Sequence, residues 1–171
     1  NFPLMGSYWT AADVLIQHKP RLYITNSALH NPTGATLSPV TAHRLLRLAQ
    51  AHDLLIVEDD IYADFEHSPA PRLAAFDGLE RVIHIGSFSK TLSAAVRCGF
   101  IAARPEWIAP LIDMKIATSF THDPLSAELL YHLLSNGHYR KHMADVREKL
   151  AAMRPVIIRK LAALGIQPWN V

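Results

Sequence analysis

Hydrophobic residues in the first hundred positions gather in short runs that are separated by turn-forming polar residues. Four of these runs are rich in β-branched residues or continuously apolar, as expected of strands in a covered sheet. They are RLYIT (21–25), LLIV (54–57), RVIHIGS (81–87) and GFIAA (99–103). Ser38 and Pro39 form a typical helix start, followed by apolar residues on one helical face. Strand and helix in alternation predict an α/β domain with a mostly parallel sheet.

The pattern changes to helical spacing after position 104 and predicts helices at 105–119, 124–135 and 138–164. In the last of these, apolar residues recur every three or four positions on one side. They are Met143, Val146, Leu150, Met153, Ile157, Leu161 and Leu164. Pro155 lies inside this segment, so we expect a kink there.

The composition is that of a globular domain, with 50% hydrophobic and 19% charged residues in a chain of 171. The net charge of +2 is too small, and the basic residues too scattered, to indicate nucleic-acid or membrane binding by this segment. A single cysteine, Cys98, cannot form an internal disulfide and favours a cytoplasmic setting. The chain opens at Asn1 without an initiator methionine, so we expect it to be a piece of a longer protein.

Polar residues gather directly after three of the predicted strands. They are His30 and Asn31 after the first, Glu58, Asp59, Asp60 and Tyr62 after the second, and Ser87, Ser89, Lys90 and Arg97 after the third. In a parallel α/β sheet the carboxyl ends of the strands meet at one edge, where ligands bind. The sequence therefore predicts one site at this edge, built from three loops.

The chemistry of this set suits a cofactor that carries a phosphate, a basic ring nitrogen, a phenolic oxygen and an aldehyde. Serine hydroxyls and an arginine bind a phosphate dianion through charge-assisted hydrogen bonds. A lysine with a neutral amine can form an imine with the aldehyde. A carboxylate keeps the ring nitrogen protonated, and asparagine and tyrosine can bind the phenolic oxygen. These requirements together describe pyridoxal 5'-phosphate.

The same residues resemble the core motifs of the fold-type I aminotransferases. HNPTG at 30–34 is similar to the Asn-Pro-x-Gly turn of that family, VEDDIYADF at 57–65 to its Asp-x-x-Tyr element, and SFSKTLSAAVRCGF at 87–100 to its Ser-x-Ser-Lys…Arg-x-Gly element. The resemblance implies Lys90 as the catalytic lysine that carries the cofactor. It implies the following cofactor-binding residues: Asn31 and Tyr62 at the ring oxygen, Asp59 at the ring nitrogen, and Ser87, Ser89 and Arg97 at the phosphate.

The sequence departs from the family pattern in two ways. Ala94-Ala95 stand where many relatives have Pro-Gly, which changes the loop after the lysine. In addition, some of the family's motifs are missing, which indicates a partial domain. The upstream glycine-rich loop, the ring-stacking aromatic residue and the distal substrate arginine of the family are not in this sequence. By analogy, residues 1–137 are the later half of the large, cofactor-binding domain. Residues 138–171 are then the long helix leading to a small domain.

Within the family, NPTGATLSP, IVEDDIYADFE and YRKHMADVREKL resemble the MocR-type regulators most. In those proteins a GntR-type winged helix precedes an aminotransferase-like domain that senses the cofactor or its adducts. The resemblance implies DNA binding through a domain outside this chain, an amino acid or similar effector, and a homodimer. An amino-acid aminotransferase shares the same core and is the alternative, so the sequence leaves open whether the intact protein is an enzyme.

Other interpretations explain fewer of these residues. Asp60 could replace Asp59 as the ring partner, although the spacing to Tyr62 favours Asp59. Ser87-x-x-Lys90 also matches a serine acylase motif, but its companion elements are not present, and no strand is followed by a dinucleotide-binding glycine motif. His138 and His142 are four residues apart, but without the glutamate of a zinc-protease motif we interpret them as a solvated helix face and predict no metal site.

Overall fold

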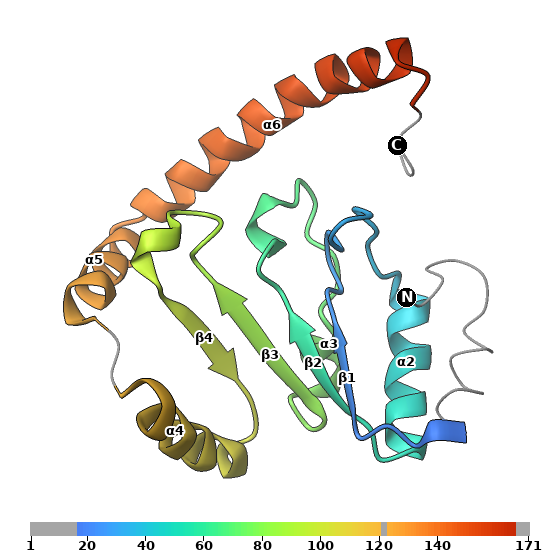
Figure 1. The fold of residues 1–171 in the computed structure, drawn as a ribbon, viewed down its shortest axis with the longest axis vertical. Coiled ribbons are helices and arrows are strands. Elements are labelled where there is room, and N and C mark those ends of the chain that lie inside the picture. The colour runs from blue at the N-terminus through green and yellow to red at the C-terminus, as the bar shows by residue number, and fades with distance from the viewer. Residues whose placement is uncertain (1–16, 121–122, 167–171) are drawn as a thin grey trace.

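The computed structural model describes residues 17–120 and 123–166, and its elements follow one another in an α/β pattern (Figure 1). Strands, 3-10 helices (η) and α-helices appear in the order β1 (Leu22–Thr25), α2 (Pro39–Ala51), β2 (Leu55–Asp59), η1 (Ala63–Phe65), α3 (Leu73–Asp77), β3 (Val82–Ser87), η2 (Ala94–Val96), β4 (Gly99–Ala102), α4 (Pro105–Ser119), α5 (Pro124–Ser135) and α6 (His138–Ala163). All four predicted strands and all four predicted helices are present. The short elements α3, η1 and η2 were not predicted.

The sheet has the strand order β1-β2-β3-β4. The first three strands are parallel, as predicted, whereas β4 runs antiparallel to β3. Close contact between these last two strands requires glycine at Gly99, where a side chain would meet backbone, whereas at Gly86 the Phe100 ring would have to move. A Cβ at Gly86 would lie 2.4 Å from the Phe100 ring, and one at Gly99 would lie 2.7 Å from the Gly86 carbonyl. The mostly parallel sheet of the prediction is confirmed.

Helix α2 begins where the sequence predicts it. The Ser38 hydroxyl caps the helix by accepting a hydrogen bond from the Thr41 amide at 3.2 Å, and Pro39 occupies the first helical position. Both crossover connections, through α2 and through α3, have the same direction, so the two helices lie on the same face of the sheet. Their apolar residues build the core with Leu54, Ile56 and Val82.

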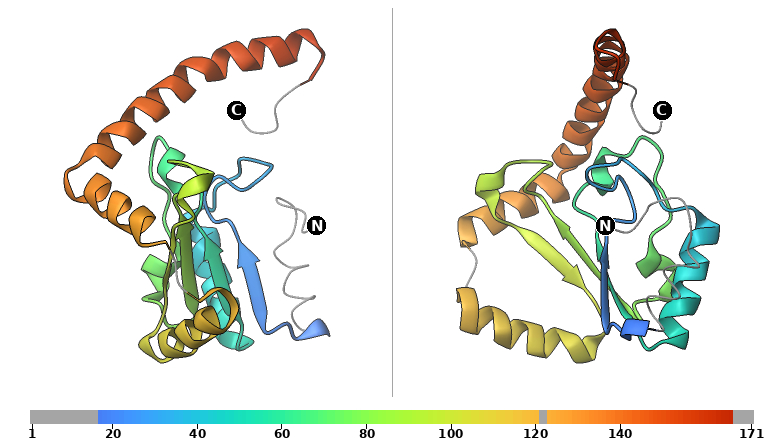
Figure 2. Two further views of the ribbon diagram at one scale, coloured as in Figure 1. Left: turned by 60° about the vertical axis from the view of Figure 1, so that its left-hand side comes forward. Right: turned by 45° about the vertical axis from the view of Figure 1, so that its right-hand side comes forward.

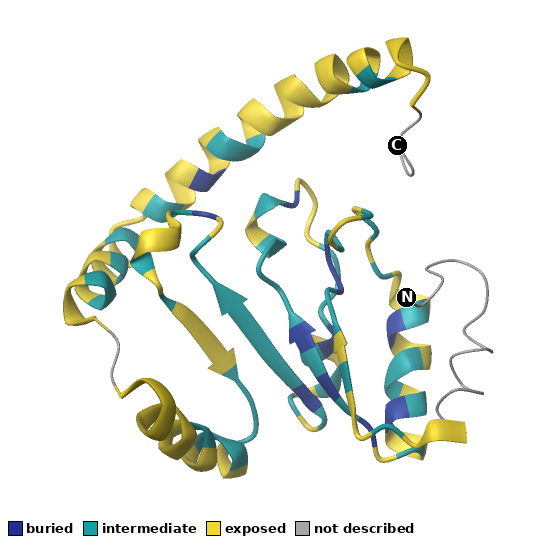
Figure 3. Cartoon of the chain, viewed as in Figure 1, coloured by how far each residue is buried: buried dark blue, intermediate teal, exposed yellow. Residues whose placement is uncertain are grey.

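The two faces of the sheet differ in burial. Along β2, buried and intermediate residues alternate (Figure 3). The covered face, which α2 and α3 pack against, carries Ile56, Glu58, Val82 and His84. The open face carries Leu22, Ile24, Val57, Asp59, Ile85 and Ser87. Parallel register assigns these faces, because Glu58 is paired with His84 and Asp59 with Ile85. On the open face the Leu22 and Ile24 side chains of β1 are 47% and 66% exposed.

Helices α4, α5 and α6 follow the sheet, and α6 extends well beyond it (Figure 2). Helix α6 continues through Pro155 as a single helix, which is curved in Figure 1. Of its predicted apolar side, Met143 is buried, whereas Leu150, Met153, Ile157 and Leu164 are exposed. In the described part of the chain no helix combines the length and the apolarity that a bilayer-spanning segment needs.

Candidate functional site

The carboxyl ends of β1, β2 and β3 lie at the same edge of the sheet, and the three polar loops leave from it (Figure 1). The backbone ties these ends together, because the Asp60 amide donates to the Ile85 carbonyl at 2.9 Å. The Asn26 amide nitrogen, just after β1, donates to the Asp59 carbonyl at 3.0 Å. The fold therefore brings the three predicted loops to one edge.

Asp59 is the last residue of β2, and its side chain belongs to the open face. Its carboxylate oxygen Oδ1 accepts a hydrogen bond from the Ile61 amide at 3.1 Å. Its second oxygen, Oδ2, has no hydrogen-bond partner among the described residues. Ser87 lies on the same face, two residues after Ile85, the partner of Asp59. A carboxylate and a hydroxyl from adjacent strands thus face the same side of the sheet.

Glu58 points to the covered face and is fully buried. Its carboxylate accepts hydrogen bonds from the Ser27 hydroxyl, from the amides of Leu73 at 2.8 Å and Ala74 at 3.0 Å, and from His84 Nδ1 at 3.3 Å. Burial by itself would raise the pKa of Glu58, but these hydrogen bonds outweigh it and hold the pKa below its ordinary value. This ionised carboxylate joins the loop after β1, the start of α3 and strand β3.

The Asp60 carboxylate also binds other side chains of the fold. Its Oδ2 lies 2.6 Å from Arg72 Nε and 3.7 Å from His84 Nε2, and Arg72 Nη2 binds Glu66 at 2.5 Å. The side chain of Asp60 is 7% exposed, and this burial raises its pKa in spite of Arg72. The structure therefore distinguishes the two candidates for the ring nitrogen. Asp60 Oδ2 binds Arg72, and its Oδ1 is buried without a hydrogen-bond partner among the described residues, whereas the unpartnered oxygen of Asp59 belongs to the open face.

The loop after β1 is a compact turn that contains Asn31. The His30 amide donates to the Ala35 carbonyl at 2.9 Å, and the Gly34 amide returns to the His30 carbonyl at 2.7 Å. Gly34 has a φ of 69°, a conformation that favours glycine. The Asn31 side chain is exposed and makes no hydrogen bond to another described residue. The structure places Asn31 in a loop at the site edge without joining it to Asp59 or Tyr62.

Tyr62 lies in the turn after β2, directly before η1. Its ring is half-buried, and the centroid of the Phe65 ring is 6.4 Å away. Tyr62 and Asp59 therefore leave the same strand end three residues apart, as the sequence indicates.

The loop after β3 holds the two serines, the lysine and the arginine. Ser87 Oγ lies 3.0 Å from Ser89 Oγ and accepts a hydrogen bond from the Ser89 amide at 3.1 Å. Lys90 follows in an exposed turn. Arg97 ends η2 in the left-handed conformation, with a φ of 49°, and is exposed. Ala94 and Ala95, at the departure from the family pattern, form η2, whose start is capped by the Ser93 hydroxyl.

These groups fit the requirements of pyridoxal phosphate in their chemistry. Two serine hydroxyls lie within hydrogen-bond distance of each other at the end of β3, and an exposed guanidinium closes the same loop. A lysine amine is solvent-accessible on that loop, and a carboxylate oxygen without a described partner lies on the neighbouring strand. Among the described residues, the Lys90 amine and the Arg97 guanidinium make no hydrogen bond or ion pair.

The sequence did not predict the residues that hydrogen-bond the acidic groups at this edge. Asn26, His84 and Arg72 hold Asp59, Glu58 and Asp60 in place. One signal was available: Glu58 and Ile56 are two apart in a strand, so a charged residue at Glu58 falls on the buried face. Such a carboxylate requires partners, although only the register of β2 and β3 shows that His84 is one of them.

Comparison with known proteins gives matches of three kinds: a family model, a curated relative and solved structures. The model of the family described as aminotransferase class I and II matches residues 11–171. The HTH-type transcriptional regulator NorG of Staphylococcus aureus (strain bovine RF122 / ET3-1) is 33% identical over 165 residues, which are 95% of this chain and 37% of that protein. The chain thus spans little more than a third of this curated relative.

Two solved structures share the fold. The multiple substrate aminotransferase of Thermococcus profundus has a TM-score of 0.81 and 28% identity, with 90% of this chain and 39% of that chain covered. LysN, the α-aminoadipate aminotransferase of Thermus thermophilus, solved with N-(5'-phosphopyridoxyl)-L-leucine, has a TM-score of 0.79 and 28% identity, with 92% and 42% covered. The matched lengths make the chain a partial domain, as predicted. The chain belongs to the class I and II aminotransferase family.

Proposed function

We propose that this chain is the pyridoxal-phosphate-binding, aminotransferase-like part of a MocR-type transcriptional regulator. The cofactor proposal rests on the convergence of three strand ends at one edge, with Asp59 and Ser87 on the same face. The regulator proposal rests on the relative named as a transcriptional regulator, which matches 95% of the chain.

The residues of the three loops divide the binding of the cofactor among them. Ser87, Ser89 and Arg97 would hold the phosphate, where an arginine fork and two hydroxyls match its charge and geometry. Asp59 would bind the ring nitrogen, and Asn31 and Tyr62 the ring oxygen. Lys90 would attach covalently to the aldehyde and, if turnover occurs, move a proton as general base. The bound cofactor supplies an electron-accepting ring and a reactive carbonyl.

The remaining parts of the proposal concern the intact protein. Residues 1–137 would form the later half of the large domain, and residues 138–171, which begin with α6, would lead to a small domain. DNA binding comes from a domain outside this chain, and an amino acid or a similar amine is the effector. The protein acts as a cytoplasmic homodimer.

One experiment separates the regulator from an enzyme. The intact protein is used to select sequences from a random duplex DNA pool, with and without pyridoxal phosphate. A regulator enriches a common sequence motif, and the cofactor changes the affinity for that motif. The absence of any enriched motif in both conditions would contradict the regulator proposal.

The alternative is an amino-acid aminotransferase, and its support is that the two structural relatives are named as aminotransferases. Its mark is a half-reaction: an added amino acid converts the bound cofactor to the pyridoxamine form, which absorbs at shorter wavelength. Screening the twenty amino acids against the cofactor-loaded protein tests this directly. Conversion by one amino acid together with no DNA selection would replace the regulator proposal.

A further inference from the structure

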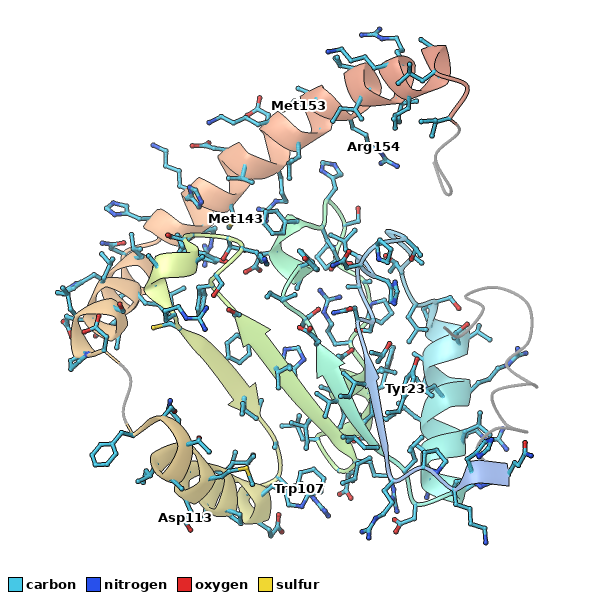
Figure 4. The ribbon with its side chains drawn as sticks, in the orientation of Figure 1. Tyr23, Trp107, Asp113, Met143, Met153 and Arg154 are labelled. Atoms are coloured by element: carbon cyan, nitrogen blue, oxygen red, sulfur yellow. The ribbon has the colours of Figure 1, made fainter. Side chains whose placement is uncertain are left out.

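The first turns of α6 lie against two of the site loops, and this contact was not expected from the sequence. Met143 in this part of the helix is 2% exposed, whereas Met153, further along, is 56% exposed. Figure 4 shows Met143 on the part of α6 next to the sheet, with Met153 and Arg154 on the part that extends beyond it. Only the beginning of α6 is therefore packed against the described fold.

Two side chains of α6 contact the lysine loop. His142 Nε2 lies 2.8 Å from the carbonyl oxygen of Thr91, the residue directly after Lys90. A carbonyl only accepts hydrogen bonds, so Nε2 carries the proton and donates it. The Tyr139 ring meets the Phe88 ring edge-on, with centroids 5.5 Å apart. His142 is therefore more than part of a solvated helix face, which corrects the interpretation from the sequence.

The same part of α6 contacts the turn that follows Tyr62. The Tyr139 hydroxyl donates a hydrogen bond to the Asp64 carboxylate, and Arg147 Nη1 donates to the Asp64 carbonyl at 2.8 Å. Asp64 lies in η1, which begins directly after Tyr62. Burial and the hydrogen bond to Asp64 raise the pKa of Tyr139, so its hydroxyl stays protonated and remains a donor.

We propose that His142 and Tyr139 are positioning residues that join the Lys90 loop to the Tyr62 turn. We call the two side chains and their contacts the α6 clamp. The positioning role rests on the proposed function, whereas the contacts themselves do not. Because Tyr139 touches both loops, a displacement of α6 moves both of them together. The helix continues unbroken to Ala163, so a movement of its far part would also shift the loop that carries Lys90.

Within the lysine loop, the clamp adds to a small number of backbone hydrogen bonds. The Phe88 amide donates to Cys98 at 3.0 Å and the Leu92 amide to Phe88 at 2.9 Å. The peptide between Lys90 and Leu92 is held by His142 through the Thr91 carbonyl. Loss of that hydrogen bond releases the backbone next to Lys90 while the strand itself stays paired.

Hydrogen exchange of the intact protein without cofactor tests the contacts. His142→Leu should speed amide exchange in residues 88–92 by about fivefold or more, the effect expected for one hydrogen bond, and leave residues 62–65 unchanged. Tyr139→Leu should speed exchange in both segments. His142→Gln, which keeps a donor, should restore most of the protection, and His138→Leu, an exposed histidine one turn earlier on the same helix, is the matched control.

The rate at which pyridoxal phosphate is fixed on Lys90 by borohydride tests the positioning role. His142→Leu should slow attachment by about fivefold or more, and His142→Gln and His138→Leu should match the unaltered protein. Unchanged exchange in residues 88–92, or an unchanged attachment rate in His142→Leu, would overturn the clamp. If the unaltered protein takes up no label at Lys90 while exchange responds as expected, the proposed function fails and the positioning role falls with it.

Discussion

The covered and open faces of the sheet differ in how fully the two carboxylates of β2, Glu58 and Asp59, are hydrogen-bonded. On the covered face every oxygen of Glu58 is bound, and His84 contacts the carboxylates of both Glu58 and Asp60. On the open face Asp59 keeps an oxygen without a described partner. Buried polar groups need hydrogen-bond partners within the protein, whereas a group that binds a ligand needs a donor or acceptor atom that the protein does not already use. The covered face thus supports the fold, and the open face presents chemistry.

The largest expected effect falls on the edge of the open face. Lys90→Ala should abolish cofactor attachment, because only the lysine amine can join covalently to the aldehyde. The measurement is mass spectrometry of the protein after treatment with pyridoxal phosphate and borohydride. A pyridoxyl label that remains at a single site in Lys90→Ala would show that another lysine carries the cofactor. Lys115→Ala, at an exposed helix position, is the control.

A matched pair of isosteric changes tests the division between the faces. Glu58→Gln should lower the free energy of unfolding by about 2–3 kcal/mol, because it removes a buried charge from four donors. Asp59→Asn should change the free energy of unfolding by less than about 0.5 kcal/mol and weaken cofactor chemistry instead. Urea unfolding of the intact protein measures both. Equal losses for the two variants would erase the distinction between the faces.

The loss of Arg97 should have a smaller effect, which is on the affinity for the cofactor. Arg97→Ala is expected to weaken binding of pyridoxal phosphate by about tenfold or more, because it removes a charge-assisted contact to the phosphate. Binding of pyridoxal, which lacks the phosphate, should stay nearly constant. Absorbance titration with both ligands gives the comparison. A similar loss for both would place Arg97 away from the phosphate.

The smallest effect is a pH dependence on the covered face. The hydrogen bond to Glu58, together with the charge of Asp60, raises the pKa of His84 above its ordinary value of 6.5, against the effect of burial and of Arg72. The stabilisation is complete below the unfolded pKa and is lost as the pH rises through the folded one. The free energy of unfolding should therefore fall as the pH rises above about 6.5 and through the raised pKa of His84. His84→Gln should flatten that slope, and His138→Gln should not.

The sequence by itself determined the elements and the chemistry of the loops. Ser38 and Pro39 set the start of α2, and the apolar runs located all four strands, because capping and side-chain periodicity are local properties. The order of the motifs placed Asn31, Asp59 and Lys90 at or beyond the ends of three different strands. The family assignment followed from those motifs and is confirmed by the matching family model.

Only the tertiary structure decided which groups meet. Strand alternation separates Glu58 from Asp59, but the register between β2 and β3 decides that His84 faces Glu58 and Ser87 shares a side with Asp59. The docking of α6, which makes His142 a partner of the lysine loop, joins residues 51 positions apart. Such contacts depend on how whole elements pack, and no local pattern encodes them. The short helix α3 was missed for the same reason, since the buried carboxylate of Glu58 binds its first amides.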